Sequence, residues 1–250
     1  MGLFSSPHKV VRAVLVSQVL LAGAIVGLDL MRAPGSAAPG LYAPPAQGPS
    51  VRPYRPDLRP SDPSQPGGPA MRAMPEALEF DQADDAITIA GQIAPGDADR
   101  FAAWLDRTRP TATQVTLDSS GGSVSDALAI GRTIRAAGYA TRVGDGAVCL
   151  SACPYILAGG ATRQVAAGGV VGVHQHYFGQ NTILPAFMAV SDLQRAQAGV
   201  MDYLVQMGVD LRMMPYALRT PPAEINVLDP DIMADLNLTT PPADAAATDG

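Results

Sequence analysis

Short β-branched runs alternate with segments of helical period along the central chain, and this alternation limits the fold more than any other feature. The runs that read as strands are ITIAGQI, QVTLDSS, YATRV, RQVA and GVVGV, which begin at Ile87, Gln114, Tyr139, Arg163 and Gly169. Helical spacing of apolar residues covers 97–108, 123–138 and about 184–207. A helix between two strands returns the chain to the same end of the sheet, so the strands pair in parallel. The sequence therefore predicts one α/β domain over residues 78–238, with a mainly parallel sheet.

Two loops of this domain have the composition of an oxyanion or anion site. In parallel sheets the chemistry lies in loops at the carboxyl ends of strands. The segments DSSGGS (118–123) and GDGAVCLSA (144–152) each follow a predicted strand. Glycines let backbone N–H groups turn outward, and a helix that begins directly afterwards adds partial positive charge.

Ser151 lies in the second of these loops and is the candidate nucleophile. A serine that attacks a carbonyl needs a general base within hydrogen-bond reach, and the chain has three histidines. His8 precedes an apolar N-terminal run that would place it on the other side of a membrane from Ser151. The base is therefore His174 or His176, both at the end of the apolar run GVVGVHQHY. In the alternative interpretation, Ser151 only caps a helix and His174 is a satisfied core residue.

Three blocks, LDSSGGSVSDAL, CLSACPYILAGGATR and GVVGVHQ, together resemble the ClpP/crotonase superfamily. Within it they resemble the ClpP-like serine peptidases and their exported, membrane-anchored relatives. The order of the blocks agrees with the family, and the resemblance covers residues 87–177, although the stretch from Ser151 to Arg163 is slightly short. The resemblance implies a ββα-repeat spiral, a peptide or protein substrate, no cofactor, and a homo-oligomer of three or more subunits, with the helix at 184–207 as the contact element.

Carried over by position, the resemblance makes Ser151 the nucleophile and His174 its general base. The backbone N–H groups of Gly122 and Ala152 would then form the oxyanion hole. His176 is the second candidate for the base, because alternation along a strand puts it on the same face as His174.

The third member of the triad has no clear counterpart. The family has an aspartate before its C-terminal helix, and the matching region, RTPPAEINVLDPDIMADLNL, has no aspartate in register. Glu224 is nearest in place, with Asn226 and Asp229 as alternatives. Without a carboxylate the site works as a dyad in which the imidazole tautomer is less firmly set.

Cys149 and Cys153 flank the candidate nucleophile and are the chain's two cysteines. A disulfide between them is strained if both lie in one helical turn and feasible if Cys149 lies in the preceding loop; buried thiols are the alternative. A zinc site that combines them with His174 and His176 lacks the usual ligand spacing, so no metal is predicted.

An uncharged apolar run from Ala13 to Leu28 follows two basic residues. Its length lies between a signal-peptide core and the roughly 20 residues of a membrane span. Residues 1–31 therefore read as a signal anchor or a cleaved signal peptide, with a buried core helix as the alternative. A cut after Ala38 would leave Pro39 next, which favours the anchor. The basic residues place the N-terminus in the cytoplasm and the domain on the extracytoplasmic, periplasmic side.

Residues 32–77 are rich in proline and poor in aliphatic side chains. Such a segment cannot bury a core, so we expect a disordered, extended linker, with a ligand for a proline-binding partner as the alternative. Residues 239–250 read as a disordered tail. The net charge of −6 and the lack of a Lys/Arg cluster argue against nucleic acid as a partner.

The sequence therefore predicts a membrane-tethered, exported serine hydrolase, an ATP-independent peptidase that cleaves peptides or flexible protein segments through an acyl-enzyme. A crotonase-type acyl-CoA enzyme is an alternative, although an exported domain has little access to CoA. A non-catalytic ClpP-like binding module is another, and the missing aspartate is its main support.

Overall fold

The computed structural model describes residues 7–31, 50–59, 72–83, 85–176 and 186–241. The chain has two compact units, Met1–Gly48 and Pro49–Gly250. The first unit contains helix α1 (Pro7–Met31), in which His8–Gly27 has a mean hydropathy of 2.0. By length and composition this helix fits a membrane span, and a signal sequence would fit equally well.

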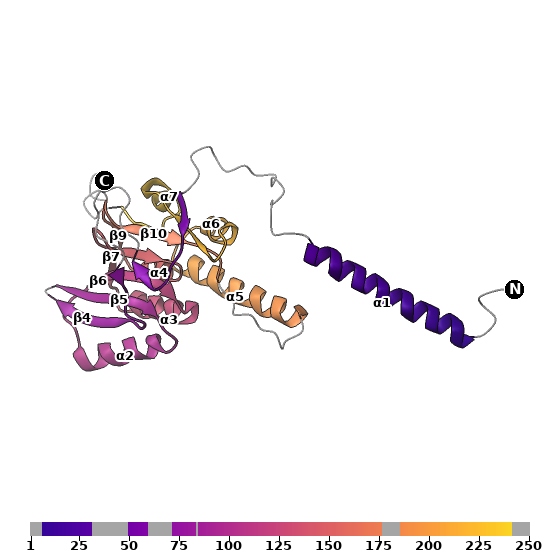
Figure 1. Cartoon of the computed structure of the whole chain (residues 1–250). Helices are drawn as coiled ribbons and strands as arrows, with labels where there is room; N and C mark the ends of the chain where they lie inside the picture. Colours follow the sequence, from indigo (N-terminus) through magenta and orange to yellow (C-terminus); the bar gives the residue numbers. More distant parts are fainter. Residues whose placement is uncertain (1–6, 32–49, 60–71, 84, 177–185, 242–250) are drawn as a thin grey trace. The chain divides into compact units, whose positions relative to one another are not determined.

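The described part of the second unit contains a nine-stranded sheet in the order β1-β11-β10-β8-β6-β5-β4, with β7 beside β6 and β9 beside β7 (Figure 1). Its strands are β1 (Ser50–Pro53), β4 (Glu79–Ala83), β5 (Ala86–Ile93), β6 (Gln114–Gly122), β7 (Ala140–Val143), β8 (Val148–Leu150), β9 (Arg163–Val165), β10 (Val170–Val173) and β11 (Glu224–Val227). Strands β2 (Leu58–Arg59) and β3 (Arg72–Ala73) form a separate antiparallel pair.

The central strands pair in parallel, which confirms the predicted mainly parallel α/β sheet. Antiparallel pairs involve β4, β11 and β1. Strand β6 pairs with β5 on one side and changes partner on the other, from β7 in its first half to β8 at Ser119. The end of β6 therefore lies next to β8, and this contact brings the two glycine-containing loops together.

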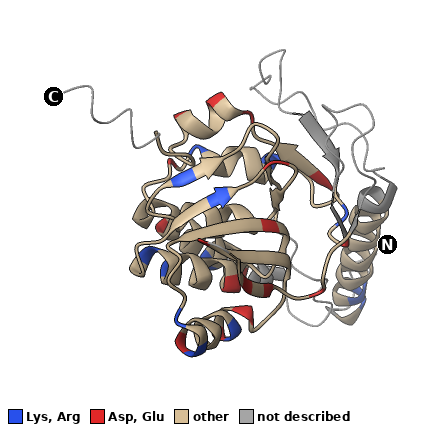
Figure 2. Ribbon diagram, turned by 90° about the vertical axis from the view of Figure 1, so that its left-hand side faces the viewer, with Lys and Arg blue, Asp and Glu red and all other residues tan. Residues whose placement is uncertain are grey.

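Helices follow the strands in the predicted order. They are α2 (Asp97–Thr108), α3 (Val124–Ala136), α4 (Cys153–Ala158), α5 (Ala186–Gln206), α6 (Met213–Arg219) and α7 (Pro230–Asp235). Each amphipathic helix buries an apolar face; Phe101, Ile130, Ile156 and Tyr203 belong to one continuous core. Among the residues coloured in Figure 2, Lys and Arg are interspersed with Asp and Glu, with no basic stripe across this view.

The linker expected over residues 32–77 differs from the structure in its second half. Residues 50–59 and 72–77 belong to the second unit, and β1 pairs along β11. Proline lacks an N–H group but is tolerated on an edge strand, so proline-rich composition did not exclude this pairing. Strand β1 thus pairs with the domain expected over residues 78–238, although it lies before the first residue of that range. The expected disorder of residues 32–49, 60–71 and 242–250 lies outside the described residues.

Candidate active site

Ser151 occupies a tight turn between strand β8 and helix α4. Its φ is +61°, one of the few positive values at a non-glycine position in the described chain. Its amide donates to the carbonyl of Gly172 at 2.9 Å, which ties the turn to β10. A left-handed backbone costs a residue with a side chain roughly 1–2 kcal/mol. The surroundings therefore hold Ser151 in a conformation that it would not adopt alone.

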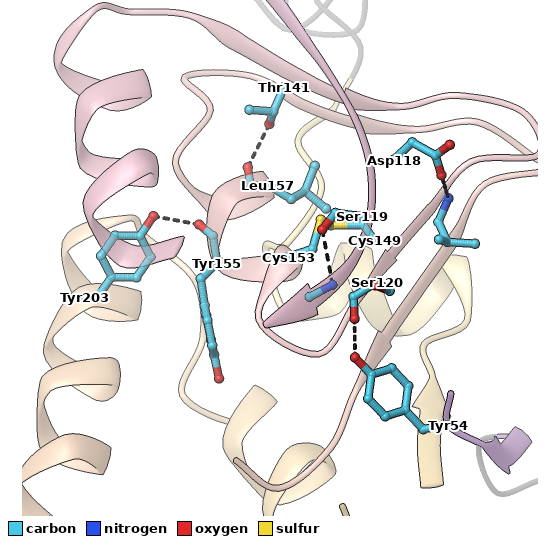
Figure 3. Close-up of a disulfide and its surroundings, with 12 residues drawn as sticks. Tyr54, Asp118, Ser119, Ser120, Thr141, Cys149, Cys153, Tyr155, Leu157 and Tyr203 are labelled. Atoms are coloured by element: carbon cyan, nitrogen blue, oxygen red, sulfur yellow. Dashed lines mark hydrogen bonds between the residues drawn. A yellow bond between two sulfur atoms is a disulfide. The ribbon is translucent and has the colours of Figure 1, made fainter. Parts of the chain in front are cut away.

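A disulfide joins Cys149 to Cys153 across this turn (Figure 3). Cys149 is in β8 and Cys153 is the first residue of α4, so the two are not in one helical turn, and their Cα atoms are 5.0 Å apart. Both cysteines are fully buried. The structure thus has the disulfide and not the two buried thiols. Among the described residues there is no cluster of metal-ligating side chains. The disulfide closes the turn that carries Ser151.

His174 directly follows strand β10, and its Nε2 lies 2.7 Å from Ser151 Oγ. Its Nδ1 lies 3.0 Å from the carbonyl oxygen of Pro222. A carbonyl can only accept, so the proton belongs on Nδ1, and Nε2 accepts the hydrogen bond from the Ser151 hydroxyl. Burial lowers the pKa of His174, and the carbonyls of Pro222 and Pro221 oppose this shift. The imidazole is therefore neutral at pH 7 and in the tautomer that a general base requires.

His176 has a different partner. Its Nε2 lies 2.8 Å from the hydroxyl of Tyr155, whose ring meets the imidazole edge-on. Burial lowers its pKa, and the neighbouring His174 adds to this shift. Of the two candidate bases, the structure brings only His174 to Ser151.

Glu224 is not the orienting group of the histidine, which corrects the sequence-based expectation. The carbonyl of Pro222 holds the place at Nδ1. Glu224 begins β11, where its amide donates to the carbonyl of Pro221 at 3.0 Å. The reason is local: the Pro-Pro sequence before β11 brings a main-chain oxygen to the imidazole two residues before the carboxylate.

The two alternatives do not replace Glu224. Asn226 is buried and lies opposite Val173 in the ladder between β10 and β11, and its Oδ1 has no hydrogen-bond partner among the described residues. Asp229 is exposed and precedes α7. In the described chain the imidazole thus faces carbonyl oxygens rather than a carboxylate.

The glycine pair at the end of β6 packs against the Ser151 turn. Gly121 has φ +92°, and a Cβ there would lie 2.5 Å from Ser151 Cβ and 2.9 Å from the amide nitrogen of Ala152. Gly122 has φ +142°, and a Cβ there would lie 2.2 Å from the carbonyl oxygen of Ile93. Only glycine fits at either position. The amide nitrogen of Ala152, an expected oxyanion donor, thus lies beside the glycine pair.

Tyr54 is a site residue that the sequence interpretation missed. It follows β1, and its ring centroid lies 4.5 Å from that of His174. Its hydroxyl donates to the carbonyl of Ser120, beside the glycine pair (Figure 3). Burial raises the pKa of Tyr54 to about 12, against a hydrogen bond with Ser151 that lowers it, so the phenol stays protonated. The only hint in the sequence was an aromatic residue between two prolines.

A cavity of about 810 Å³ lies away from the dyad. Residues of β9, of the loop before β10, and of the segment from β11 into α7 line it, and neither Ser151 nor His174 does. The contact between Ser151 and His174 therefore lies outside this cavity.

No known family model matches the chain, and no curated protein matches it. Among solved structures, the chain is similar to a mutant of the 1510-N membrane-bound stomatin-specific protease. The sequences are 17% identical, the alignment covers 64% of this chain and 80% of the other, and the TM-score is 0.44.

Proposed function

We propose that the protein is a membrane-tethered, ClpP-like serine hydrolase that cleaves peptides or flexible protein segments without ATP. The observation that carries this proposal is the 2.7 Å contact between Ser151 Oγ and His174 Nε2. The positive φ of Ser151 and the adjoining glycine turn support it. Nucleophilic serines need a base and a nearby set of N–H donors. His174 is the proposed base, and the amides of Ala152 and Gly122 are the proposed donors.

The reaction begins when the Ser151 oxygen attacks the carbonyl carbon of a peptide bond and its proton moves to His174 Nε2. The amides of Ala152 and Gly122 stabilise the oxyanion that forms. The C–N bond then breaks, and the leaving amine takes the proton from Nε2. A water molecule, deprotonated by the same nitrogen, attacks the acyl ester and releases the carboxylic acid and Ser151.

His174 carries positive charge during both steps, and the Nδ1–H donates to the carbonyl of Pro222 throughout. Carbonyl dipoles stabilise an imidazolium less than a carboxylate does. In a serine protease with a full triad, replacing the aspartate lowers kcat by about 10⁴. The proposed enzyme therefore works as a Ser–His dyad that turns over slowly.

The finer features of the fold and assembly belong to the same proposal. The strand and helix order is compatible with the ββα-repeat spiral implied by the sequence resemblance. Helix α5 exposes Val190, Met201 and Val205, which would suit contact between subunits of a homo-oligomer. Helix α1 would anchor the chain, with the catalytic domain on the extracytoplasmic side.

Labelling with a fluorophosphonate probe tests the proposal on the full-length protein in detergent. Wild type should label, Ser151→Ala and His174→Ala should not, and His176→Ala should label as the matched histidine control. Circular dichroism and the melting temperature check that each variant is folded. A folded wild type that does not react contradicts the proposal.

A non-catalytic binding module is the second candidate, and one observation favours it: no carboxylate faces His174 Nδ1 among the described residues. In that case neither wild type nor any variant reacts with the probe, and the site at Ser151 would serve ligand binding only.

A further inference from the structure

We propose that residues 50–57, which we call the strap, are an internal plug that blocks Ser151 and must move before a substrate can bind. This inference rests on the proposed hydrolase function. It concerns how the site is controlled, which the dyad geometry alone does not address.

The strap is held to the sheet by its main chain. Strand β1 pairs antiparallel with β11, from Ser50 opposite Val227 to Pro53 opposite Glu224. The amide of Tyr54 then donates to the carbonyl of Ala223 at 2.9 Å. Strand β11 also pairs with β10, and the proposed base His174 directly follows β10. The strap therefore runs along the edge of the sheet next to the catalytic histidine.

Two hydrogen bonds fix the strap to Ser120, the residue of β6 that directly precedes the glycine pair. The Tyr54 hydroxyl donates to the carbonyl of Ser120, and the Ser120 hydroxyl donates to the carbonyl of Pro56 at 2.6 Å. Ser120 is fully buried beneath these contacts. A segment that only tethers the domain would not need such contacts with the end of β6, which lies beside the Ser151 turn.

Tyr54 stands where a substrate acyl group must enter. Its ring packs against His174, and its hydroxyl donates to the carbonyl of Ser120, next to the glycine pair that packs against Ser151. An attacked carbonyl carbon must come within about 3–3.5 Å of Ser151 Oγ. Its oxygen must lie beside the amide of Ala152. The Tyr54 ring, held between His174 and the end of β6, and a substrate carbonyl cannot occupy this space together.

The strap can leave without unfolding the rest of the domain. Strand β1 is at one end of the sheet order and pairs with β11 alone. Arg55, Pro56 and Asp57 are exposed. Segments with few buried contacts open locally at a small fraction of the global free energy of unfolding. The blocked form is thus in equilibrium with an open form, and the rate at Ser151 follows the open fraction.

The test compares fluorophosphonate labelling rates of the full-length protein with those of its Tyr54→Ala and Tyr54→Phe variants. We expect Tyr54→Ala to label about tenfold faster or more, because it loses the ring contact and one hydrogen bond. Tyr54→Phe keeps the ring and should lie between the two. Tyr139→Ala is the matched control, because Tyr139 precedes β7 at the opposite end of the parallel strands, and it should label like wild type. A folded Tyr54→Ala variant that labels at the wild-type rate or more slowly overturns the plug and leaves the hydrolase standing.

A binding measurement separates the plug from the chemistry. The probe is a fluorescent peptide with the sequence of residues 49–59, PSVRPYRPDLR, and its control has alanine in place of tyrosine. The Tyr54→Ala/Ser151→Ala double variant should bind the tyrosine peptide more tightly than the alanine peptide. Equal or absent binding of the two peptides overturns the plug. Preferential binding by a protein that never labels refutes the hydrolase and retains the strap's docking site.

Discussion

Reducing the disulfide between Cys149 and Cys153 should weaken the domain and the nucleophile together. The two cysteines are four residues apart, so the bridge closes a very short loop. For such a loop the chain-entropy relation gives about 2 kcal/mol of stabilisation. For a domain of this size, that corresponds to a melting temperature about 4–8 °C lower after reduction.

The positive φ of Ser151 makes the two effects interdependent. If the reduced turn keeps its conformation, stability falls by the full amount. If the turn relaxes, it recovers part of that free energy, but Ser151 leaves its attack position and labelling slows. Stability, labelling or both must therefore change on reduction.

The assay measures the melting temperature and the fluorophosphonate labelling rate of oxidised protein and of protein refolded in reductant. A thiol count in denaturant verifies reduction. The Cys149→Ala/Cys153→Ala variant is the control, and reductant should have no effect on it. Fully reduced protein that keeps both its melting temperature and its labelling rate would refute this reasoning.

Two further predictions follow from the surroundings of His174. Glu224→Gln should label within about twofold of wild type, because the Pro222 carbonyl holds Nδ1; a loss near the 10⁴-fold seen when a triad carboxylate is replaced would restore Glu224 to the site. The labelling rate should hold as the pH falls through about 6.5, the ordinary pKa of histidine, and drop only at lower pH, since burial lowers the pKa of His174. A labelling rate whose acid midpoint lies above pH 6.5 contradicts His174 as the base. The lowered pKa of His174 also contributes stability above the unfolded pKa of histidine, and this contribution is lost as the pH falls through the pKa of the folded protein.

The sequence predicted the parts of the site that depend on local pattern. Alternating periodicity placed His174 at the end of a strand, as the structure has it. It placed Ser151 in a loop after the strand at 139–143, whereas the short strand β8 (Val148–Leu150) directly precedes this serine. The disulfide was one of two alternatives, because the sequence did not determine whether Cys149 belongs to the helix or to the loop before it.

The errors concern groups that pattern does not reveal. The partner of His174 is a main-chain carbonyl, and every residue has one, so no side chain marks Pro222 as the orienting group. Tyr54 lies in a segment whose composition is that of a linker. Its place depends on a pairing with β11, and composition carries no information on partners so distant in sequence.

The pairing of β1 with β11 also orders the events of folding. Ser50 is synthesised early and Val227 late, so the edge of β11 does not exist while most of the domain is being made. Closing so long a loop costs conformational entropy that local pairs such as β4 with β5 do not incur. We therefore expect strand β1 to join the sheet last, after a state in which the rest of the sheet is complete and this edge is still open.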